Sequence, residues 1–106
     1  MRLLVFFDIP VKTKEERKIA TAFRKFLIKD GYYMIQFSVY TRICNTLENA
    51  YSHENRLKEN LPAKGYVRDL IITERQFASM NILCGKGRKK DKKVLTEARL
   101  KKWTLN

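Results

Sequence analysis

The stretch LLVFFDIP, residues 3–10, decides the fold, because it predicts a strand at the centre of a sheet. Its first five residues are all apolar, without the alternation of a half-exposed strand, which is typical of a strand buried on both faces. Pro10 cannot donate to a strand ladder, so regular pairing should end close to it. Asp8 therefore stands at the end of a central strand, and its carboxylate requires an explanation.

Two helices are predicted next. Thr13 with Glu16 forms a capping box, and Gly31 suits the left-handed position after a helix end. Between them, apolar residues recur at helical spacing, at Ile19, Phe23, Phe26 and Leu27. A second helix is expected from a cap at Asn45 and Glu48 as far as Pro62. Its apolar stripe consists of Leu47, Ala50, Tyr51, Leu57 and Leu61.

Three further strands are predicted, over residues 32–40, 65–73 and 77–84. In the first of them Ile35, Phe37 and Val39 alternate with a polar side that consists of Gln36, Ser38 and Tyr40. In the last, the alternating apolar residues are Met80, Ile82 and Cys84. The residues alone thus indicate the order β-α-β-α-β-β and an α+β fold, an antiparallel sheet with two helices on one face.

The 106 residues predict a single domain with a core over about residues 1–84. A basic loop, GKGRKKDKK, follows at residues 85–93, and residues 94–106 fit either an amphipathic helix or an extended C-terminal arm. The N-terminus lacks a signal-peptide pattern and no apolar run reaches about 18 residues, which favours a cytoplasmic protein without a membrane span. Cys44 and Cys84 lack metal-ligand spacing and are expected to be free, buried thiols.

The chain carries 23 Lys and Arg residues against 11 Asp and Glu residues, a formal net charge of +12. Such a surface attracts polyanions, and the common soluble polyanion inside a cell is nucleic acid. The polar face of the first helix and the basic loop are predicted to follow phosphates, although a charged helix face is often only solvated. The predicted nucleic-acid-binding residues are Lys14, Arg17, Lys18, Arg24, Lys25, Arg88, Lys89 and Lys90.

Asp8 has two interpretations. It is either an acid that caps the turn at residues 10–12, or a metal ligand. Mg²⁺ is usually held by one or two carboxylates with waters and substrate phosphate, and Asp8 has no acidic neighbour in the sequence. A twofold homodimer would supply a second Asp8 across its axis and so form a site for phosphodiester chemistry.

The polar side of the strand over residues 32–40 has two readings as well. Gln36, Ser38 and Tyr40 either support the site at Asp8 or form a solvated face. His53 is the only histidine, and it is expected to be a solvated helix residue rather than a general base, since no nucleophile accompanies it.

Three segments, LLVFFDIP, RKFLIKDGYYMIQFSVY and ITERQF, resemble the small CRISPR-associated proteins of spacer acquisition, the nuclease-like partners of the CRISPR integrase. The likeness is greatest to the variety found with type II systems, and it spans most of residues 1–84. It implies a ferredoxin-like fold in which residues 32–40 are broken into part of the sheet and pair with the strand from Gly65. It also implies that residues 98–105 form an arm added to a neighbouring chain.

The resemblance further implies a homodimer with a cleft at its interface and Asp8 as the catalytic, metal-binding acid. Family members are assigned a Mg²⁺-dependent endonuclease activity on RNA or DNA. They also bridge integrase subunits and hold the double-stranded DNA to be inserted, a role that can be architectural, with the acid idle.

Two alternatives stand beside this hypothesis. KGYV, residues 64–67, begins like the base-stacking motif of an RNA-recognition domain, but RDLI after it lacks the aromatic spacing. The other alternative is a small basic interaction module without a nucleic-acid site. Asp8 distinguishes them, because a nuclease needs the acid and a divalent ion, whereas a stacking platform needs exposed rings and no acid pair.

Overall fold

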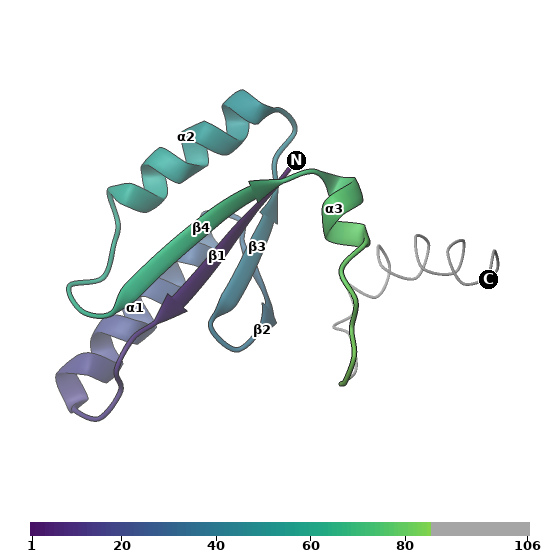
Figure 1. Cartoon of the computed structure of the whole chain (residues 1–106). Helices are drawn as coiled ribbons and strands as arrows, with labels where there is room; N and C mark the ends of the chain where they lie inside the picture. Colours follow the sequence, from purple (N-terminus) through teal and green to yellow (C-terminus); the bar gives the residue numbers. More distant parts are fainter. Residues whose placement is uncertain (86–106) are drawn as a thin grey trace.

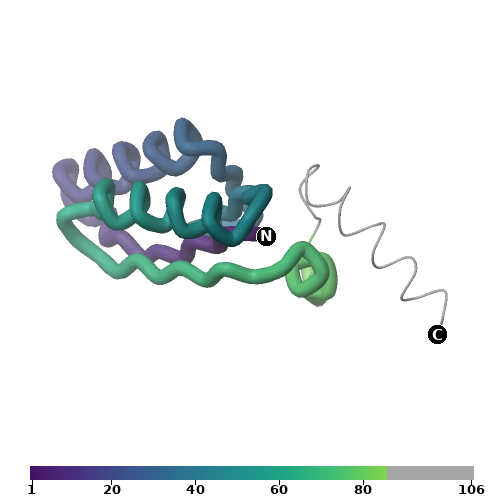
Figure 2. The backbone as a smooth tube through the Cα atoms, turned by 90° about the horizontal axis from the view of Figure 1, so that it is seen from above, coloured from purple at the N-terminus to yellow at the C-terminus, as the bar shows by residue number. Residues whose placement is uncertain are grey.

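The computed structural model describes residues 1–85, which form a four-stranded antiparallel sheet with two long helices packed on one face (Figures 1 and 2). The strand order is β2-β3-β1-β4, the arrangement of a ferredoxin-like fold, so the predicted α+β class is confirmed. The strands are β1 (Arg2–Asp8), β2 (Tyr33–Gln36), β3 (Val39–Ile43) and β4 (Tyr66–Ile72). The helices are α1 (Lys14–Lys29), α2 (Leu47–Lys58) and α3 (Glu74–Ala78).

Strand β1 lies at the centre of the sheet, as its apolar run predicts, and pairs with both β3 and β4. Its residues Leu3, Val5 and Phe7 face α1 and α2 and join the main core. The Phe7 ring meets the Phe23 ring of α1 edge-on, with the centroids 5.1 Å apart. Burying each such side chain contributes about 1.5–3 kcal/mol, so this layer of β1 against the helices supplies much of the stability.

The caps of α1 are those that the sequence predicts. The Glu16 amide donates to the Thr13 hydroxyl over 3.1 Å, and the Thr13 amide donates to the Glu16 carboxylate over 3.0 Å. Gly31 follows the helix with φ of 93°, the left-handed conformation expected there. Helix α2 is capped by Thr46, whose hydroxyl accepts from the Asn49 amide, so the predicted cap at Asn45 is wrong by one residue.

The single strand predicted over residues 32–40 is wrong, because a turn at residues 37–38 divides it into β2 and β3. Ser38 adopts φ of 64° in this turn, and a register shift interrupts the pairing between Met34 and Gln36. Phe37 is exposed within the turn, and beyond the turn Tyr40, expected on the polar side, is buried. The predicted pairing of this region with the strand after Gly65 is also wrong, because β1 lies between β3 and β4.

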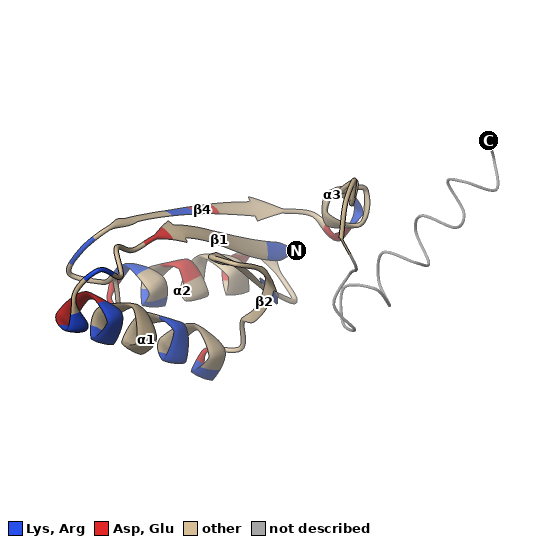
Figure 3. Cartoon of the chain, turned by 90° about the horizontal axis from the view of Figure 1, so that it is seen from below, with Lys and Arg blue, Asp and Glu red and all other residues tan. Residues whose placement is uncertain are grey.

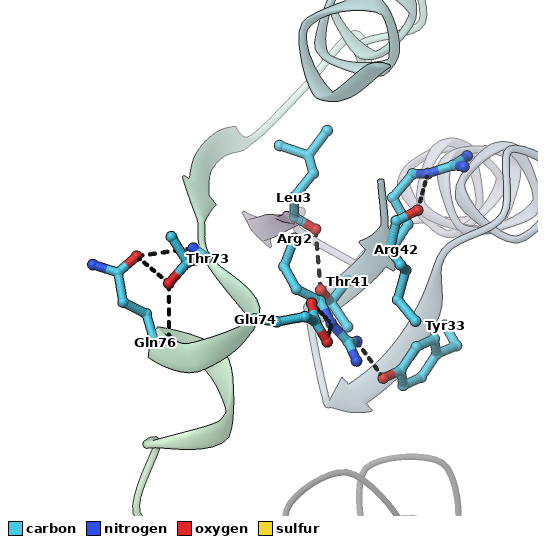
Figure 4. A network of polar contacts seen from close by, with 9 residues as sticks. Arg2, Leu3, Tyr33, Thr41, Arg42, Thr73, Glu74 and Gln76 are labelled. Carbon is cyan, nitrogen blue, oxygen red and sulfur yellow. Dashed lines mark hydrogen bonds and ion pairs between the residues drawn. The ribbon is translucent and has the colours of Figure 1, made fainter. Parts of the chain in front are cut away.

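The strand predicted over residues 77–84 is wrong, and its beginning belongs to α3. A capping box starts this helix directly after β4, with the Gln76 amide donating to the Thr73 hydroxyl over 3.0 Å (Figure 4). Phe77 is buried under the guanidinium of Arg2, whose central carbon lies 4.0 Å from the ring centroid. Within residues 1–85, no strand follows β4.

Arg2 fastens α3 to the sheet (Figure 4). Although it is fully buried, its Nε donates to the Glu74 carboxylate over 2.7 Å, and a terminal nitrogen donates to the Tyr33 hydroxyl over 2.6 Å. Arg2 lies on the sheet face that points away from α1 and α2, here called the outer face. Helix α3 therefore covers only the end of the outer face that contains Arg2.

Fewer residues of α2 are buried than its apolar stripe predicts. Ala50 and Leu57 are buried, whereas Leu47, Tyr51 and Leu61 remain about half exposed. Cys44 is a buried free thiol as expected, but Cys84 is exposed, so that part of the prediction is wrong. None of the helices in the described part of the chain has the length and apolar character to cross a bilayer. The predicted basic loop and C-terminal arm lie outside the described residues except at Gly85.

A pair of carboxylates, Glu54 of α2 and Asp69 of β4, gives a pH-dependent stability. The contact with Asp69 raises the pKa of Glu54 above its ordinary value, and burial adds to this effect. The folded state thus binds the proton more tightly than the unfolded chain, so the benefit is complete at low pH and is lost as pH rises through the raised pKa. At pH 7 the two carboxylates repel each other.

We expect Glu54→Gln to stabilise the fold at pH 7 by about 0.5 kcal/mol, the scale of a solvent-screened surface charge pair, which raises the midpoint of thermal unfolding by about 2–4 °C. The gain should disappear near pH 4, and Asp69→Asn should give no further gain in the double variant. Thermal melts followed by circular dichroism at the two pH values measure this. A loss of stability on Glu54→Gln at pH 7 would contradict the repulsion.

Candidate active site and basic surface

Asp8 is the last residue of β1, and its side chain lies exposed on the outer face. Arg2, Leu4 and Phe6 share this face, and α3 covers the Arg2 end. At about 3.4 Å per residue, Asp8 stands about 20 Å from Arg2, at the end that α3 leaves uncovered. The length of β1 therefore sets the position of Asp8, and the short helix α3 does not reach far enough to cover it.

The backbone around Asp8 is fixed from the β4 side by Gly65. Gly65 has φ of 94°, and an added Cβ would overlap the Asp8 carbonyl oxygen and lie 3.0 Å from the Ile9 Cα. This close approach brings β4 into register, so that Asp8 pairs with Tyr66 as the last pair of the ladder. Pairing ends there, two residues before Pro10, as the sequence predicts.

The turn between β2 and β3 lies on the other side of Asp8. The Phe7 amide donates to the Ser38 carbonyl over 3.0 Å, which holds this turn against the end of β1. Phe37, at the tip of the turn, is 86% exposed, although its alternation with Ile35 and Val39 predicts burial. Nothing in the sequence signals this exposure, since Ser38 is not a residue type that usually marks a left-handed turn.

The proposed supporting residues are only partly brought together. Gln36 ends β2 and is exposed, and Ser38 reaches β1 through its backbone carbonyl. Tyr40 lies on the helix face of the sheet, with its ring centroid 5.6 Å from that of Phe7. The sheet therefore separates the Tyr40 side chain from Asp8.

Within residues 1–85, no group of three or more His, Cys, Asp and Glu side chains gathers as a metal site. His53 instead belongs to a network that joins the end of α1 to α2 and β3. Its Nδ1 lies 2.9 Å from the Asp30 carboxylate, which also accepts from Arg56 over 2.7 Å, and Arg42 donates to the Asp30 carbonyl. His53 is thus a half-buried structural residue, not the solvated one expected.

The solvent-facing side of α1 forms the basic surface of the described residues (Figure 3). It contains a shallow depression of about 420 Å³. The residues that line it are Lys14, Arg17, Lys18, Thr21, Ala22 and Lys25. Arg24 is exposed on α1 but does not line the depression. Arg88, Lys89 and Lys90 lie outside the described residues.

Arg17 differs from its basic neighbours because its side chain is held by the backbone. Its terminal nitrogen donates to the carbonyls of Val11 and Lys12, each over 3.1 Å. These residues belong to the loop that leaves β1 after Asp8. Arg17 therefore stabilises this loop, and the other basic side chains that line the depression are Lys14, Lys18 and Lys25.

Residues 1–80 match the family model described as CRISPR associated protein Cas2. The chain belongs to the Cas2 family. A relative from Acidovorax ebreus, named CRISPR-associated endoribonuclease Cas2, is 55% identical over 94 residues, which cover 89% of this chain and 92% of that protein. Relatives of the same name from Campylobacter jejuni and Ligilactobacillus salivarius are 54% and 50% identical. They match over 80% and 81% of this chain, and over 59% and 85% of their own lengths.

Membership of the Cas2 family confirms the resemblance carried by LLVFFDIP, QFSVY and ITERQF, all of which lie within the matched residues. Membership of the Cas2 family also argues against the alternative of an RNA-recognition domain. The partial motif KGYV lies at the start of the edge strand β4, not on a central strand of the sheet. On the outer face, the central strand β3 presents Val39 and Thr41, neither of which has an aromatic ring. The matched residues of the Cas2 family include Asp8 and the whole of α1.

Proposed function

We propose that this Cas2-family chain is a metal-dependent endonuclease of CRISPR adaptation that works as a homodimer, with one Asp8 from each chain at the active centre. The observation that carries the proposal is the exposed strand-end Asp8 at the end of the outer face that α3 leaves uncovered. The relatives' printed names, which call them endoribonucleases, support a nuclease. RNA and DNA are both candidate substrates, and the cytoplasm is the proposed location.

The uncovered part of the outer face has the composition of a subunit interface. Its apolar residues are Phe6, Tyr66 and Leu70, which are 37%, 76% and 52% exposed. A twofold contact places the same residues of two copies against one another. Because Asp8 shares this face, the contact would bring two Asp8 side chains to a common cleft.

We therefore expect a homodimer at micromolar concentration in sedimentation equilibrium. Leu70→Lys places a charge in the proposed interface and should shift the chain to monomer, because an unpaired buried charge is costly. Leu47→Lys, which changes a similarly exposed leucine on α2, is the matched control and should leave the dimer intact. A wild-type chain that stays monomeric at this concentration would remove the paired-acid proposal.

We expect the described residues to suit Mg²⁺ better as a pair of chains than as a single chain. One chain offers the carboxylate of Asp8 without a second metal-ligating cluster in residues 1–85, and Mg²⁺ is usually held by one or two carboxylates, waters and substrate phosphate. When bound, the metal would polarise the phosphate and stabilise the charge that develops on it. Asp8 would hold the ion, and Gly65 fixes the backbone of Asp8 from the neighbouring strand.

The α1 surface is the proposed contact for nucleic acid in the adaptation complex. It lies on the helix side of the molecule, whereas Asp8 lies on the outer face, so holding double-stranded DNA and cleaving a strand use separate surfaces. This separation favours the second candidate role, in which the dimer bridges integrase subunits and holds DNA without using its acid.

Lys14, Lys18 and Lys25 should give duplex binding a steep salt dependence, because each phosphate contact releases counterions and adds about −0.9 to the logarithmic slope. Replacing all three by Ala should flatten the salt slope by about 2–3. It should also weaken binding to duplexes of unrelated sequence equally, because phosphate contacts carry no base information. Salt titrations of duplex binding measure this. A variant with Lys58 and Arg75 replaced by Ala loses positive charge outside α1 and is the control; an equal effect per charge removed in the two variants would contradict the proposal.

A further inference from the structure

An apolar groove lies on the helix side of the molecule, between α1 and the loop that follows α2, and is here called the α1 groove. Its volume is about 340 Å³. Its apolar lining comes from Ile19, Phe23 and Phe26 of α1 and from Leu61 and Pro62 of the loop. Ile19 and Phe26 are only partly buried, and Leu61 is half exposed. The apolar stripe of α1 is therefore left incompletely covered along this edge.

The loop wall of the α1 groove is held in place at both of its ends. Asn60 donates from its side-chain amide to the Arg56 carbonyl over 2.8 Å. After the loop, the Lys64 ammonium lies 3.7 Å from the carboxylate of Glu16, in the first turn of α1. Pro62 restricts the backbone between these two points. A partner thus meets a groove that is already formed, and binding costs little ordering of the loop.

The basic depression of α1 lies directly beside the α1 groove, and Ala22 lines both. Lys18 and Lys25 stand four residues before and three residues after Ala22, so they flank it on the same side of the helix. Within residues 1–85, no carboxylate forms an ion pair with either lysine. An apolar groove is therefore bordered by cations that are available to a partner.

We propose that the α1 groove and its bordering lysines bind an acidic amphipathic helix of another protein. Such a helix presents apolar residues at i, i+4 and i+7 to the groove, while its Glu and Asp side chains meet Lys18 and Lys25. The groove lies opposite the outer face, so the proposed homodimer leaves it free.

The charge of the chain argues against three other occupants. A second copy has a net charge of +12, and residues 86–106 contain nine Lys and Arg against two Asp and Glu, so both have the wrong sign. Nucleic acid has the right sign and would use the lysines, but its phosphates gain nothing from an apolar lining.

Docking of the helix would compete with duplex DNA, because both would use Lys18 and Lys25. Only this competition rests on the proposed role of α1 in holding DNA, and the docking itself does not. The lysines would serve either partner, whereas the apolar lining would serve the helix alone. Variants of the lining and variants of the lysines therefore separate the two kinds of binding.

The test measures fluorescence anisotropy of a labelled designed peptide of about 18 residues, long enough to form a helix, with leucines at helical spacing on one face and glutamates elsewhere. A second peptide replaces every glutamate by lysine and keeps the apolar face. The acidic peptide should bind at least about tenfold more tightly than the lysine peptide, since only its charges complement α1. It should also displace a labelled duplex from the full chain.

Two variants and one control locate the binding. Leu61→Ser should weaken the acidic peptide about 5- to 10-fold and leave duplex binding unchanged. Leu47→Ser alters a similarly exposed leucine of α2 outside the groove and should change neither. A variant with Lys18 and Lys25 replaced by Ala keeps the lining and should weaken both the peptide and the duplex.

Equal binding of the two peptides, or binding of neither at millimolar concentration, would overturn the inference. So would a Leu61→Ser chain that binds the acidic peptide like wild type. A Leu61→Ser chain that loses as much affinity for the duplex as for the peptide would assign the groove to nucleic acid instead. A wild-type chain that binds the peptide but no duplex would refute the proposed role of α1 in holding DNA and leave the docking site standing.

Discussion

Asp8→Asn should reduce metal-dependent cleavage of RNA or DNA by at least about a hundredfold. The substitution keeps the size of the side chain and removes the carboxylate charge from each chain of the proposed dimer. Asp8 is exposed at the end of β1, so the change leaves the core intact and should not alter the thermal midpoint. The measurement is cleavage of labelled single strands over a range of Mg²⁺ concentrations.

Two controls accompany the Asp8 variant. Asp69→Asn makes the same chemical change on the helix side of the sheet, where it faces Val5 in register, and should leave cleavage unchanged. Duplex binding in EDTA should stay the same or tighten slightly in Asp8→Asn, because a negative charge is removed. Equal cleavage by wild type and Asp8→Asn would assign the activity to a contaminant and leave the architectural role alone.

Gly65→Ala should destabilise the fold by about 2–4 kcal/mol, since a left-handed backbone and a steric overlap with β1 act together. An added Cβ meets backbone atoms of Asp8 and Ile9, which have no flexible side chain that could move aside. For a domain of this size the thermal midpoint should fall by about 10–25 °C. Thermal melts of purified protein measure the effect.

Gly85→Ala is the matched control for Gly65→Ala. Gly85 has φ of 97°, nearly the same as the 94° of Gly65, but an added Cβ there meets no atom within 4 Å. It should therefore show only the backbone cost, about 1 kcal/mol or less. Equal losses at the two positions would mean that the close approach of β4 to Asp8 does not contribute.

The parts of the fold that the sequence predicts are those with strong local signals. The unbroken apolar run of β1 indicates a central strand, and Thr13 with Glu16 marks the start of α1, because each pattern is complete within a few residues. The turn that separates β2 from β3 has no such signal. Its left-handed residue is Ser38 rather than glycine, and its conformation depends on the pairing of the neighbouring strands.

Helix α3 shows a different limit. Its capping box, Thr73 and Gln76, is present in the sequence, but the alternation of Met80, Ile82 and Cys84 favours a strand. The deciding interactions are long-range: Arg2, at the other end of the chain, binds Glu74 and packs on Phe77. Periodicity in a short window cannot include a partner 72 residues away.

The residues of the candidate site also differ in how far the sequence predicts them. Asp8 is identified by its place after a buried strand, whereas the exposure of Phe37 and Tyr66 beside it depends on turn geometry and register. The basic face of α1 follows from helical spacing, but the role of Arg17 in holding the loop after β1 depends on where the Val11 and Lys12 carbonyls point. Residue types predict candidates, and only tertiary contacts separate their roles.

The central claim, that two Asp8 carboxylates form one active centre, is tested most directly by a mixed dimer with a single Asp8→Asn chain. Two differently tagged chains are co-expressed, and the mixed dimer is purified through both tags. A shared centre predicts that its cleavage rate lies close to that of the doubly substituted dimer, because each centre needs both acids. A rate of about half the wild-type value would show that each chain works alone, and would contradict the paired centre.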